Sequence, residues 1–475
     1  MKALRILLTI VLLIGPAVAR ILWFYNGQYS RPTAIAMPDY KNLSAPILPL
    51  STPEAAPVSG VESTHKTIVV DMAHDNLFDL PEIETLTRQL TGRGARLQVI
   101  QGKTIFMSEL GDALKRASAY VVIAPMSNFT LYEVRQVQRF VEQGGRVLVI
   151  ADPTRLGIFV ESVTAPNSLL VPFDLAFSDD YLYNLAENEG NYRNVIFRQF
   201  AADPLTQRLA SVVLYATRSV NTSAGTPLIR ASEATLSSHT DTGGDLAASA
   251  LSADGQVLAL GDLTFLTPPY NQVADNSRLI GNLADFLLGG QRTREFTDMP
   301  FLFTRPVSIL PTRNITLTAD LVESLGQLQT ALRADFIAST VISAPVDGHD
   351  RIVLGSYSPS GDFLPYVRPF YPVLAAFPLN IDIKNPNTFV ELPGVGKVKR
   401  WGTGVMVLDR ADERTTLILI ADDPDRLSSL VDIVATGAME NCAFQGQYAL
   451  CNLLASDEDR EPPGKEQKRD ADTTP

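Results

Sequence analysis

The feature that most constrains the fold is a regular alternation of short apolar runs and amphipathic segments in the first third of the chain. Four apolar runs have the length and composition of buried strands, at residues 67–71, 95–100, 120–124 and 146–152. Three segments between them carry apolar residues at helical spacing, at residues 81–90, 108–117 and 130–143. Because strands and helices that alternate with short links form βαβ units, this pattern predicts an α/β fold. The expected sheet is mostly parallel and flanked by helices on both faces.

The segment at residues 130–143 carries the clearest helix signals. Thr130 and Glu133 have the spacing of a capping box, and Gly144 follows the last apolar position. Residues 153–254 are less regular and are expected to form loops and antiparallel additions. A strand at residues 257–262 and a helix at residues 276–288 then complete the pattern, with Asp275 as the expected N-cap of that helix.

A second alternation follows and predicts a smaller α/β domain. Its signals are a Leu-rich helix around residues 321–332, strands at residues 404–409 and 415–422, and a helix with Asp423 as cap, Pro424 as first residue and Gly437 at its end. The expected domains are residues 66–291 and 300–455. Residues 27–65, rich in Pro, Ser and Ala, are expected to be a spacer, and the charged residues 456–475 a disordered tail.

The N-terminal residues 1–26 indicate passage into or across a membrane. Lys2 and Arg5 precede an apolar stretch, and aromatic residues 23–25 end it. One interpretation is a cleaved secretory signal, with residues 17–19 as the small-residue cleavage site. The other, which we favour, is an uncleaved signal anchor that forms one transmembrane helix. In that case the basic N-terminal end stays in the cytoplasm, and the bulk of the chain is expected to be extracytoplasmic in a single-pass protein of the cell membrane.

Charge and cysteine content exclude several classes of function. The chain has 475 residues with 40 Lys and Arg against 52 Asp and Glu, a net charge of −12, which repels phosphate backbones and makes nucleic-acid binding unfavourable. Two Cys and four His are too few for zinc-finger or iron–sulfur arrays. Cys442 and Cys451 are close enough in sequence for a disulfide in an oxidising compartment, which we favour over two free buried thiols.

Five polar residues are candidates for ligand binding in the first domain. Asp71, Asp152 and Asp262 each follow an apolar strand, and in an open parallel sheet ligands bind outside the carboxyl ends of the strands. His74 and Asn76 lie in the loop after the first strand, where His74 would serve as a general base or metal ligand. The alternative is structural, because Asp after a strand commonly caps the next turn and a polar loop commonly binds its own backbone.

The first domain resembles a known but uncharacterised family. The resemblance rests on the runs VDMAHDNLF at 70–78, VVIAP at 121–125 and GGRVLVIAD at 144–152, followed by residues 167–174, 260–266 and 274–282. These are similar to extracytoplasmic bacterial and archaeal proteins with a class I glutamine-amidotransferase-like, or flavodoxin-like, domain. Similar domains occur in accessory subunits of gliding-motility ABC transporters and in intraflagellar-transport proteins. The resemblance covers roughly residues 66–290.

The resemblance implies a catalytic cysteine that this chain does not have. Amidotransferases of this class carry a nucleophilic Cys at a strained turn after a central strand, and here the turn after Ala124 contains Pro125, Met126 and Ser127. Without the thiolate, attack on an amide is not expected. Ser127 also lacks the Gly-x-Ser-x-Gly context of a nucleophile elbow.

These observations together predict a non-catalytic, membrane-anchored binding or scaffold protein that requires no cofactor. The expected partner is a protein, either a transporter subunit or an envelope component. The alternative is a metal-assisted hydrolase that acts on a polar envelope substrate through Asp71, His74, Asp152 and Asp262.

Overall fold

The computed structural model describes residues 2–25, 66–101, 108–153, 163–357, 366, 389–392, 396–411 and 414–454. The chain divides into two compact units, Met1–Pro46 and Ile47–Pro475, which are treated separately below. The predicted spacer at residues 27–65 and the predicted tail at residues 456–475 lie outside the described residues.

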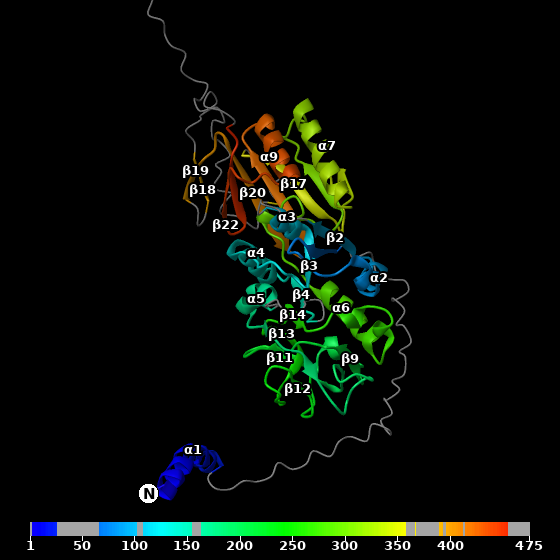
Figure 1. Cartoon of the computed structure of the whole chain (residues 1–475). Coiled ribbons are helices and arrows are strands. Elements are labelled where there is room, and N and C mark those ends of the chain that lie inside the picture. The colour runs from blue at the N-terminus through cyan, green and yellow to red at the C-terminus, as the bar shows by residue number, and fades with distance from the viewer. Residues whose placement is uncertain are drawn as a thin grey trace, which may run out of the picture. The chain divides into compact units, whose positions relative to one another are not determined.

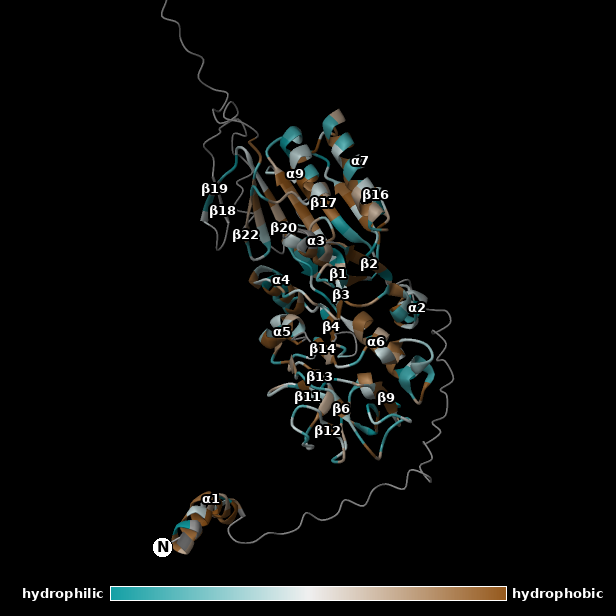
Figure 2. Ribbon diagram, viewed as in Figure 1, coloured by the Kyte–Doolittle hydropathy of each residue, from teal (hydrophilic) through white to brown (hydrophobic). Residues whose placement is uncertain are grey.

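The first unit contains one helix, α1 (Lys2–Tyr25), whose described side chains are nearly all exposed. In the part of the chain that the structure describes, it is the helix that is long and apolar enough to cross a membrane, over Ala3–Phe24. Its 24 residues correspond to about 36 Å, slightly more than the hydrocarbon core of a bilayer. Figure 2 shows its predominantly hydrophobic surface. A cleaved signal and an uncleaved anchor would both form such a helix.

The second unit begins with a mixed eight-stranded sheet, which we call the first lobe (Figure 1). Five neighbouring strands run parallel, in the spatial order β2 (Arg96–Gln101), β1 (Thr67–Met72), β3 (Ala117–Ile123), β4 (Arg146–Ile150) and β14 (Val257–Leu260). Three antiparallel strands extend the β14 edge, β13 (Ala247–Leu251), β11 (Thr226–Arg230) and β8 (Gln199–Phe200). The expected parallel core is therefore confirmed, within a sheet that is mixed as a whole.

Helices cover both faces of this sheet. On one face, α2 (Glu84–Gly92) and α6 (Asn276–Gly289) pack in the same core cluster as Ile68 and Val70. On the other face lie α3 (Ser108–Arg116), α4 (Leu131–Glu142) and α5 (Thr164–Leu170), in the core cluster that contains Val69. Because successive strand side chains point to opposite faces, each central strand fills both clusters and is buried along its length.

The irregular segment of the first lobe consists of short antiparallel pairs, as expected from its sequence. They are β5 (Ala176–Phe177) with β10 (Val220–Asn221), β6 (Leu182–Tyr183) with β12 (Leu236–Ser237), and β7 (Asn194–Phe197) with β9 (Val212–Tyr215). The helix α5 at the start of this segment was not expected.

A second mixed sheet of seven strands forms the second lobe. Four strands are parallel, in the order β16 (Ser339–Val341), β15 (Val307–Pro311), β17 (Asp350–Ser356) and β21 (Arg414–Ala421). Three antiparallel strands follow, β20 (Thr403–Ala411), β23 (Tyr448–Asn452) and β22 (Cys442–Gln445). A separate hairpin pairs β18 (Phe389–Leu392) with β19 (Gly396–Lys399). The second α/β sheet is thus confirmed, although of its seven strands only β20 and β21 were predicted from the sequence.

The described helices of the second lobe, α7 (Ala319–Ala334) and α9 (Pro424–Thr436), lie side by side on one face of the sheet (Figure 1). The Leu residues expected on α7 are buried there. The caps of α9 are those expected, since the Asp423 side chain accepts a hydrogen bond from the main chain of Arg426 and Gly437 has a positive φ of 72°.

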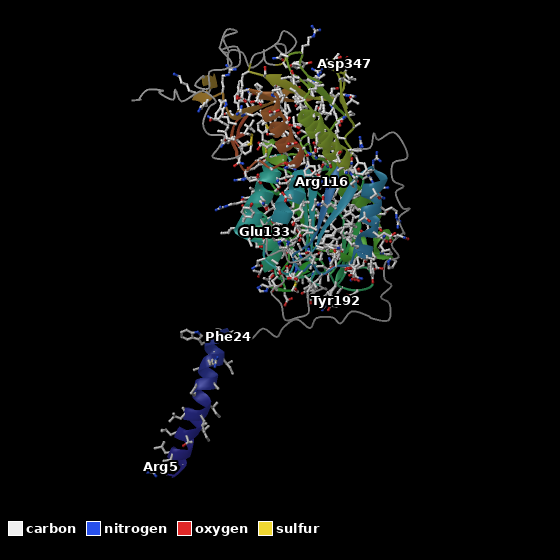
Figure 3. All side chains as sticks on the ribbon, turned by 90° about the horizontal axis from the view of Figure 1, so that it is seen from above. Arg5, Phe24, Arg116, Glu133, Tyr192 and Asp347 are labelled. Atoms are coloured by element: carbon white, nitrogen blue, oxygen red, sulfur yellow. A yellow bond between two sulfur atoms is a disulfide. The ribbon has the colours of Figure 1, made fainter. Side chains whose placement is uncertain are left out.

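Buried arginines join the two lobes. Arg292 donates to the carbonyl oxygens of Lys115 and Ala117 at 3.0 and 3.1 Å, at the C-terminal end of α3, and its other terminal nitrogen pairs with Asp298. Both partners of this pair are almost fully buried, with side chains 5% and 4% exposed. The segment between α6 and β15, residues 290–306, is called the linking segment. Arg116, labelled in Figure 3, stacks on Phe301 of this segment, at 4.2 Å from the ring centre.

The Arg292→Met variant tests this junction. We expect it to lower the free energy of unfolding by about 3–5 kcal/mol, because Asp298 would remain buried without its cation. The matched control is Arg88→Met on α2, whose pair with Glu84 is exposed and whose loss should cost less than about 0.5 kcal/mol. Urea unfolding of the full chain in detergent, followed by circular dichroism, measures both. Equal effects of the two substitutions would contradict a structural role for the buried pair.

Candidate functional site

The candidate site lies at the carboxyl ends of β1 and β3, where two loops meet. Asp71 is the second-last residue of β1, and the loop after it contains His74 and Asn76 before the short helix η1 (Leu80–Ile83) begins. The loop after β3 starts at Ala124 and leads to Thr130, the N-cap of α4. Because β1 and β3 are parallel neighbours, both loops leave the sheet at the same edge.

Main-chain hydrogen bonds hold the two loops together. The amides of Met126 and Ser127 both donate to the carbonyl of His74, at 2.9 and 3.0 Å, and the amide of Leu77 donates to Ala124 at 3.0 Å. The Asn76 side chain donates to the carbonyl of Ile123 at 2.7 Å and accepts from the amide of His74 at 3.0 Å. Asn76 therefore acts as the side chain that joins the loops.

Two residues of these loops have left-handed backbone conformations that are unusual for residues with a side chain. Ala124 has a φ of 42° and Asp75 a φ of 51°. Such conformations cost about 1–3 kcal/mol each and persist only where surrounding contacts fix them, here the hydrogen bonds that join the loops.

The imidazole of His74 is bonded on both of its nitrogens. Nδ1 lies 2.9 Å from Oδ2 of Asp71, and Nε2 lies 3.5 Å from Oε1 of Glu133, in the first turn of α4. The ring stacks on Phe129, with centroids 3.8 Å apart. The His74 side chain is 8% exposed and that of Asp71 is fully buried.

The two carboxylates decide the protonation state of His74. Burial alone would lower the pKa of the imidazole, but the hydrogen bonds and negative charges of Asp71 and Glu133 outweigh it and raise the pKa from 6.5 to about 9. His74 is therefore an imidazolium at neutral pH, held by a charge-assisted hydrogen bond to Asp71 and an ion pair with Glu133.

Glu133 has two roles in the site. One carboxylate oxygen faces His74, while the other accepts hydrogen bonds of 2.7 Å from the amide and the hydroxyl of Thr130, which completes the capping box of α4. The hydrogen bond from His74, and those from Thr130, lower the pKa of Glu133 from 4.5 to about 2, although burial opposes them. The positive end of the α4 dipole lies at the same place and also favours the carboxylate.

This arrangement does not suit catalysis by His74. A general base needs an unprotonated nitrogen that reaches the substrate, and a metal ligand needs a free lone pair. Here the ring is protonated and both nitrogens are directed at carboxylates. His74 and its two carboxylates instead form a fixed, charged group beneath the loops after β1 and β3.

The two remaining predicted carboxylates form a separate pair. The strand β4 lies next to β14 in the sheet, so Asp152 and Asp262, which follow these strands, come close together. Burial and the charge of Asp152 raise the pKa of Asp262. The strand β3 lies between β1 and β4, so Asp152 and Asp262 are separated from Asp71. The predicted carboxylates therefore do not form one site.

Both carboxylates of this pair bind the backbone of neighbouring loops. Asp262 accepts from the amides of Tyr215 and Thr264 at 2.8 Å, and Asp152 accepts from the amide of Leu263 at 3.3 Å. Their side chains hold turns, which is the structural alternative for an Asp after a strand. Within the described ranges, no group of three or more His, Cys, Asp or Glu residues is placed to hold a metal ion.

Sequence reasoning did not identify two important parts of the site. Glu133 was recognised only as a helix cap, and Phe129 carried no signal, because both contacts with His74 join segments far apart in sequence.

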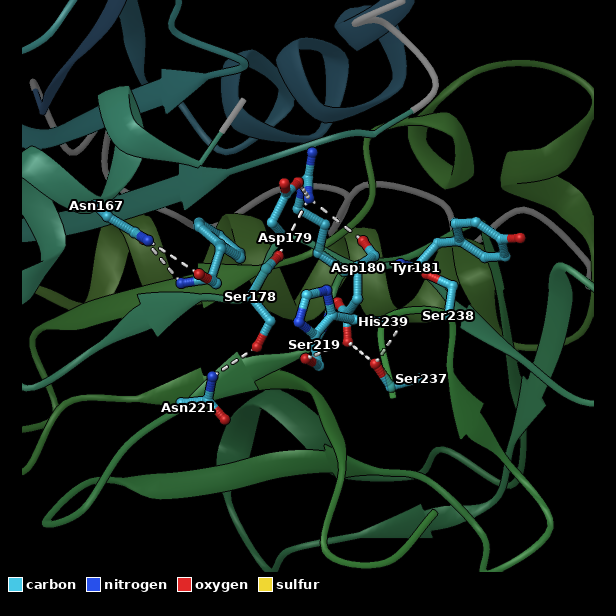
Figure 4. Close-up of polar contacts among 12 residues, drawn as sticks. Asn167, Ser178, Asp179, Asp180, Tyr181, Ser219, Asn221, Ser237, Ser238 and His239 are labelled. Atoms are coloured by element: carbon cyan, nitrogen blue, oxygen red, sulfur yellow. Dashed lines mark hydrogen bonds and ion pairs between the residues drawn. The ribbon is translucent and has the colours of Figure 1, made fainter. Parts of the chain in front are cut away.

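Figure 4 shows a further polar cluster that was not expected, in which Asp180 accepts from the amide and hydroxyl of Ser219 and from the hydroxyl of Ser237. Asp180 is 5% exposed, and these bonds join loops of the irregular segment.

The cysteines of the chain take no part in the site. Cys442 and Cys451 form a disulfide between β22 and β23 in the second lobe, so neither of the two cysteines is a free thiol. The turn after Ala124 contains Ser127 in place of a cysteine, and the Ser127 hydroxyl donates to the carboxylate of Asp75.

Comparisons with known proteins give a domain of unknown function and distant structural neighbours. Residues 84–284 match the family model described as Domain of unknown function (DUF4350). One similar solved structure is the mmIFT52 N-terminal domain, at 14% identity and a TM-score of 0.39, over 46% of this chain and 97% of that one. Another is a ThuA-like protein from Bacteroides uniformis, at 13% identity and a TM-score of 0.31, over 49% of this chain and 94% of that one. No curated protein matches the chain.

The raised pKa of His74 predicts a specific pH dependence of stability. A group whose pKa rises from 6.5 to about 9 on folding contributes fully below pH 6.5, and its contribution is lost as the pH rises through 9. The stability difference between the wild type and His74→Gln should therefore shrink by about 3 kcal/mol from pH 6 to pH 10. Urea unfolding at a series of pH values measures it.

The control for this experiment is His239→Gln. His239 is exposed, and its main-chain amide donates to the hydroxyl of Ser237, a hydrogen bond that the substitution keeps. It should leave the pH profile of the wild type unchanged. A constant difference between the wild type and His74→Gln from pH 6 to pH 10 would contradict an imidazolium between two carboxylates.

Proposed function

We propose that this protein is a membrane-anchored binding or scaffold protein, and that the loops after β1 and β3 form its binding surface. The observation that carries the proposal is the bonding of both His74 nitrogens to carboxylates, which leaves the best catalytic candidate without a free nitrogen. The site is rigid and charged, as expected of a recognition surface.

Exposed apolar side chains beside the site support a protein partner. Leu131 and Tyr132, at the start of α4, are 79% and 49% exposed, and Leu77 in the β1 loop is 38% exposed. Exposed aromatic side chains such as Tyr132 are enriched in the cores of protein interfaces. We infer a transporter subunit or an envelope component as the partner.

The proposal places the helix α1 in the cell membrane as a single-pass anchor, with both lobes on the extracytoplasmic side. The length and apolar composition of α1 and the basic residues at its start support this orientation. The disulfide of the second lobe is consistent with an oxidising compartment.

We also infer a flavodoxin-like arrangement for the first lobe, and with it a relation to amidotransferase-like domains of transporter accessory proteins. The order of its parallel strands, β2-β1-β3-β4-β14, supports this inference. No observation favours the metal-assisted hydrolase, because the residues it requires are divided between two places in the sheet.

Site-specific photo-crosslinking in intact cells tests the binding surface. A photoreactive amino acid at Leu131 or Leu77 should crosslink to one discrete partner. The control position is Val322 on α7, which is 55% exposed but lies in the second lobe, and it should give no such product. Equal products from all three positions, or none from Leu131 and Leu77, would contradict the proposed surface.

The orientation has its own test, which uses the natural cysteines. A membrane-impermeant maleimide added to intact cells should label Cys442 only after reduction, because the disulfide blocks its thiol and the lobe faces outward, whereas Cys451 is fully buried. Labelling without reduction would show that the disulfide is absent in the cell. Labelling that requires cell lysis would place the lobes in the cytoplasm.

A further inference from the structure

A cavity of about 200 Å³ lies where the linking segment passes between the lobes, and three cations are among its lining residues. Lys66, Arg292 and Arg294 line it, and Asp335 is the one carboxylate among its described lining residues. The cavity lies away from the His74 site and shares no residue with it.

The carboxylates near this cavity are already bound to arginines. Asp335 lies 3.6 Å from Arg96 and 3.5 Å from Arg116, and Asp298 pairs with Arg292. Both carboxylates are therefore paired with arginines, and their charges also act on Arg294.

Lys66 and Arg294 bind main-chain carbonyls instead. Lys66 donates to Leu288 and Gly290, at the C-terminal end of α6, at 2.5 and 3.0 Å. Arg294 donates to the carbonyl of Arg116, at the end of α3, at 3.1 Å. An ammonium has three N–H groups, so Lys66 can bind one further acceptor.

The local charge sum is positive. Lys66, Arg292 and Arg294 line the cavity, and Arg96 and Arg116 flank Asp335, whereas the carboxylates are Asp335 and Asp298. The C-terminal ends of α3 and α6 each contribute about half a negative charge. The charge of Glu295 also acts on Arg292, so about one positive charge remains uncompensated.

The pKa values of two lining cations are lowered, mainly by burial. Burial lowers the pKa of Lys66, and the charge of Arg146 lowers it further. Burial and the charge of Arg292 lower the pKa of Arg294 to about 10, although the charges of Asp335 and Asp298 oppose them. The protonated forms are thus less favourable than in water, and a bound anion would stabilise them.

We propose that this cavity binds a small divalent oxyanion of the size of inorganic phosphate. A volume of about 200 Å³ is below the roughly 300–1,000 Å³ of sites for drug-sized molecules, but it accommodates a single phosphate group. The ammonium of Lys66 is the direct ligand, and Arg292 and Arg294 supply the surrounding positive potential.

Isothermal titration calorimetry of the full chain in detergent tests the site, with inorganic phosphate as the probe and chloride at equal ionic strength as the reference. The wild type should bind one phosphate saturably. The Gln291→Glu variant places a negative charge at an exposed lining residue and should weaken binding at least tenfold. Lys66→Met should abolish saturable binding.

The matched control is Gln327→Glu, the same change at an exposed position of α7, which should alter phosphate affinity less than twofold. Three results would overturn the proposal: no saturable binding by the wild type, unchanged affinity in Gln291→Glu, or equal weakening by both glutamates. Because Gln291 and Gln327 are exposed, these outcomes remain decisive even where Lys66→Met does not fold.

Discussion

A protonated imidazole between two carboxylates is the interaction on which the arrangement of the candidate site depends. Asp71 belongs to β1, His74 to the loop that follows it, and Glu133 to the first turn of α4. Each buried charge is stable there only because the others compensate it. Since Glu133 also caps α4, the start of that helix and the orientation of His74 are fixed together. The three elements therefore form one unit, and the two loops with positive-φ residues are held by it.

The parallel core was predictable because its signals are local. The capping box of Thr130 and Glu133, and the Asp423 and Gly437 caps of α9, are complete within one helix each, and the structure contains all of them. Asp275 shows the limit of such signals, because the expected N-cap of α6 makes no capping hydrogen bond. Its carboxylate accepts from the amides of residues 210 and 211 instead. The same side chain suits both roles, and tertiary contacts decide between them.

The candidate site was predictable only in part, for a topological reason. The sequence shows that Asp71, Asp152 and Asp262 each follow a strand, but it does not give the order of the strands in space. The observed order places β3 between β1 and β4, which divides the three carboxylates into a histidine-bound residue and a buried pair. Glu133 reaches His74 only because α4 begins at the same sheet edge. Such contacts depend on register and packing, which no local pattern encodes.

The His74 site and the arginine junction between the lobes differ in how their charges are compensated. At the His74 site, two carboxylates enclose one cation, and all three groups belong to adjacent loops of one lobe. At the junction, arginines outnumber carboxylates and are held largely by helix-end carbonyls from the first lobe and by the linking segment. A helix end offers only partial charge, so it orients a guanidinium without neutralising it. At the His74 site, the charge of the imidazolium is therefore fully compensated by the two carboxylates. At the junction, the arginines join the lobes and part of their positive charge is not compensated.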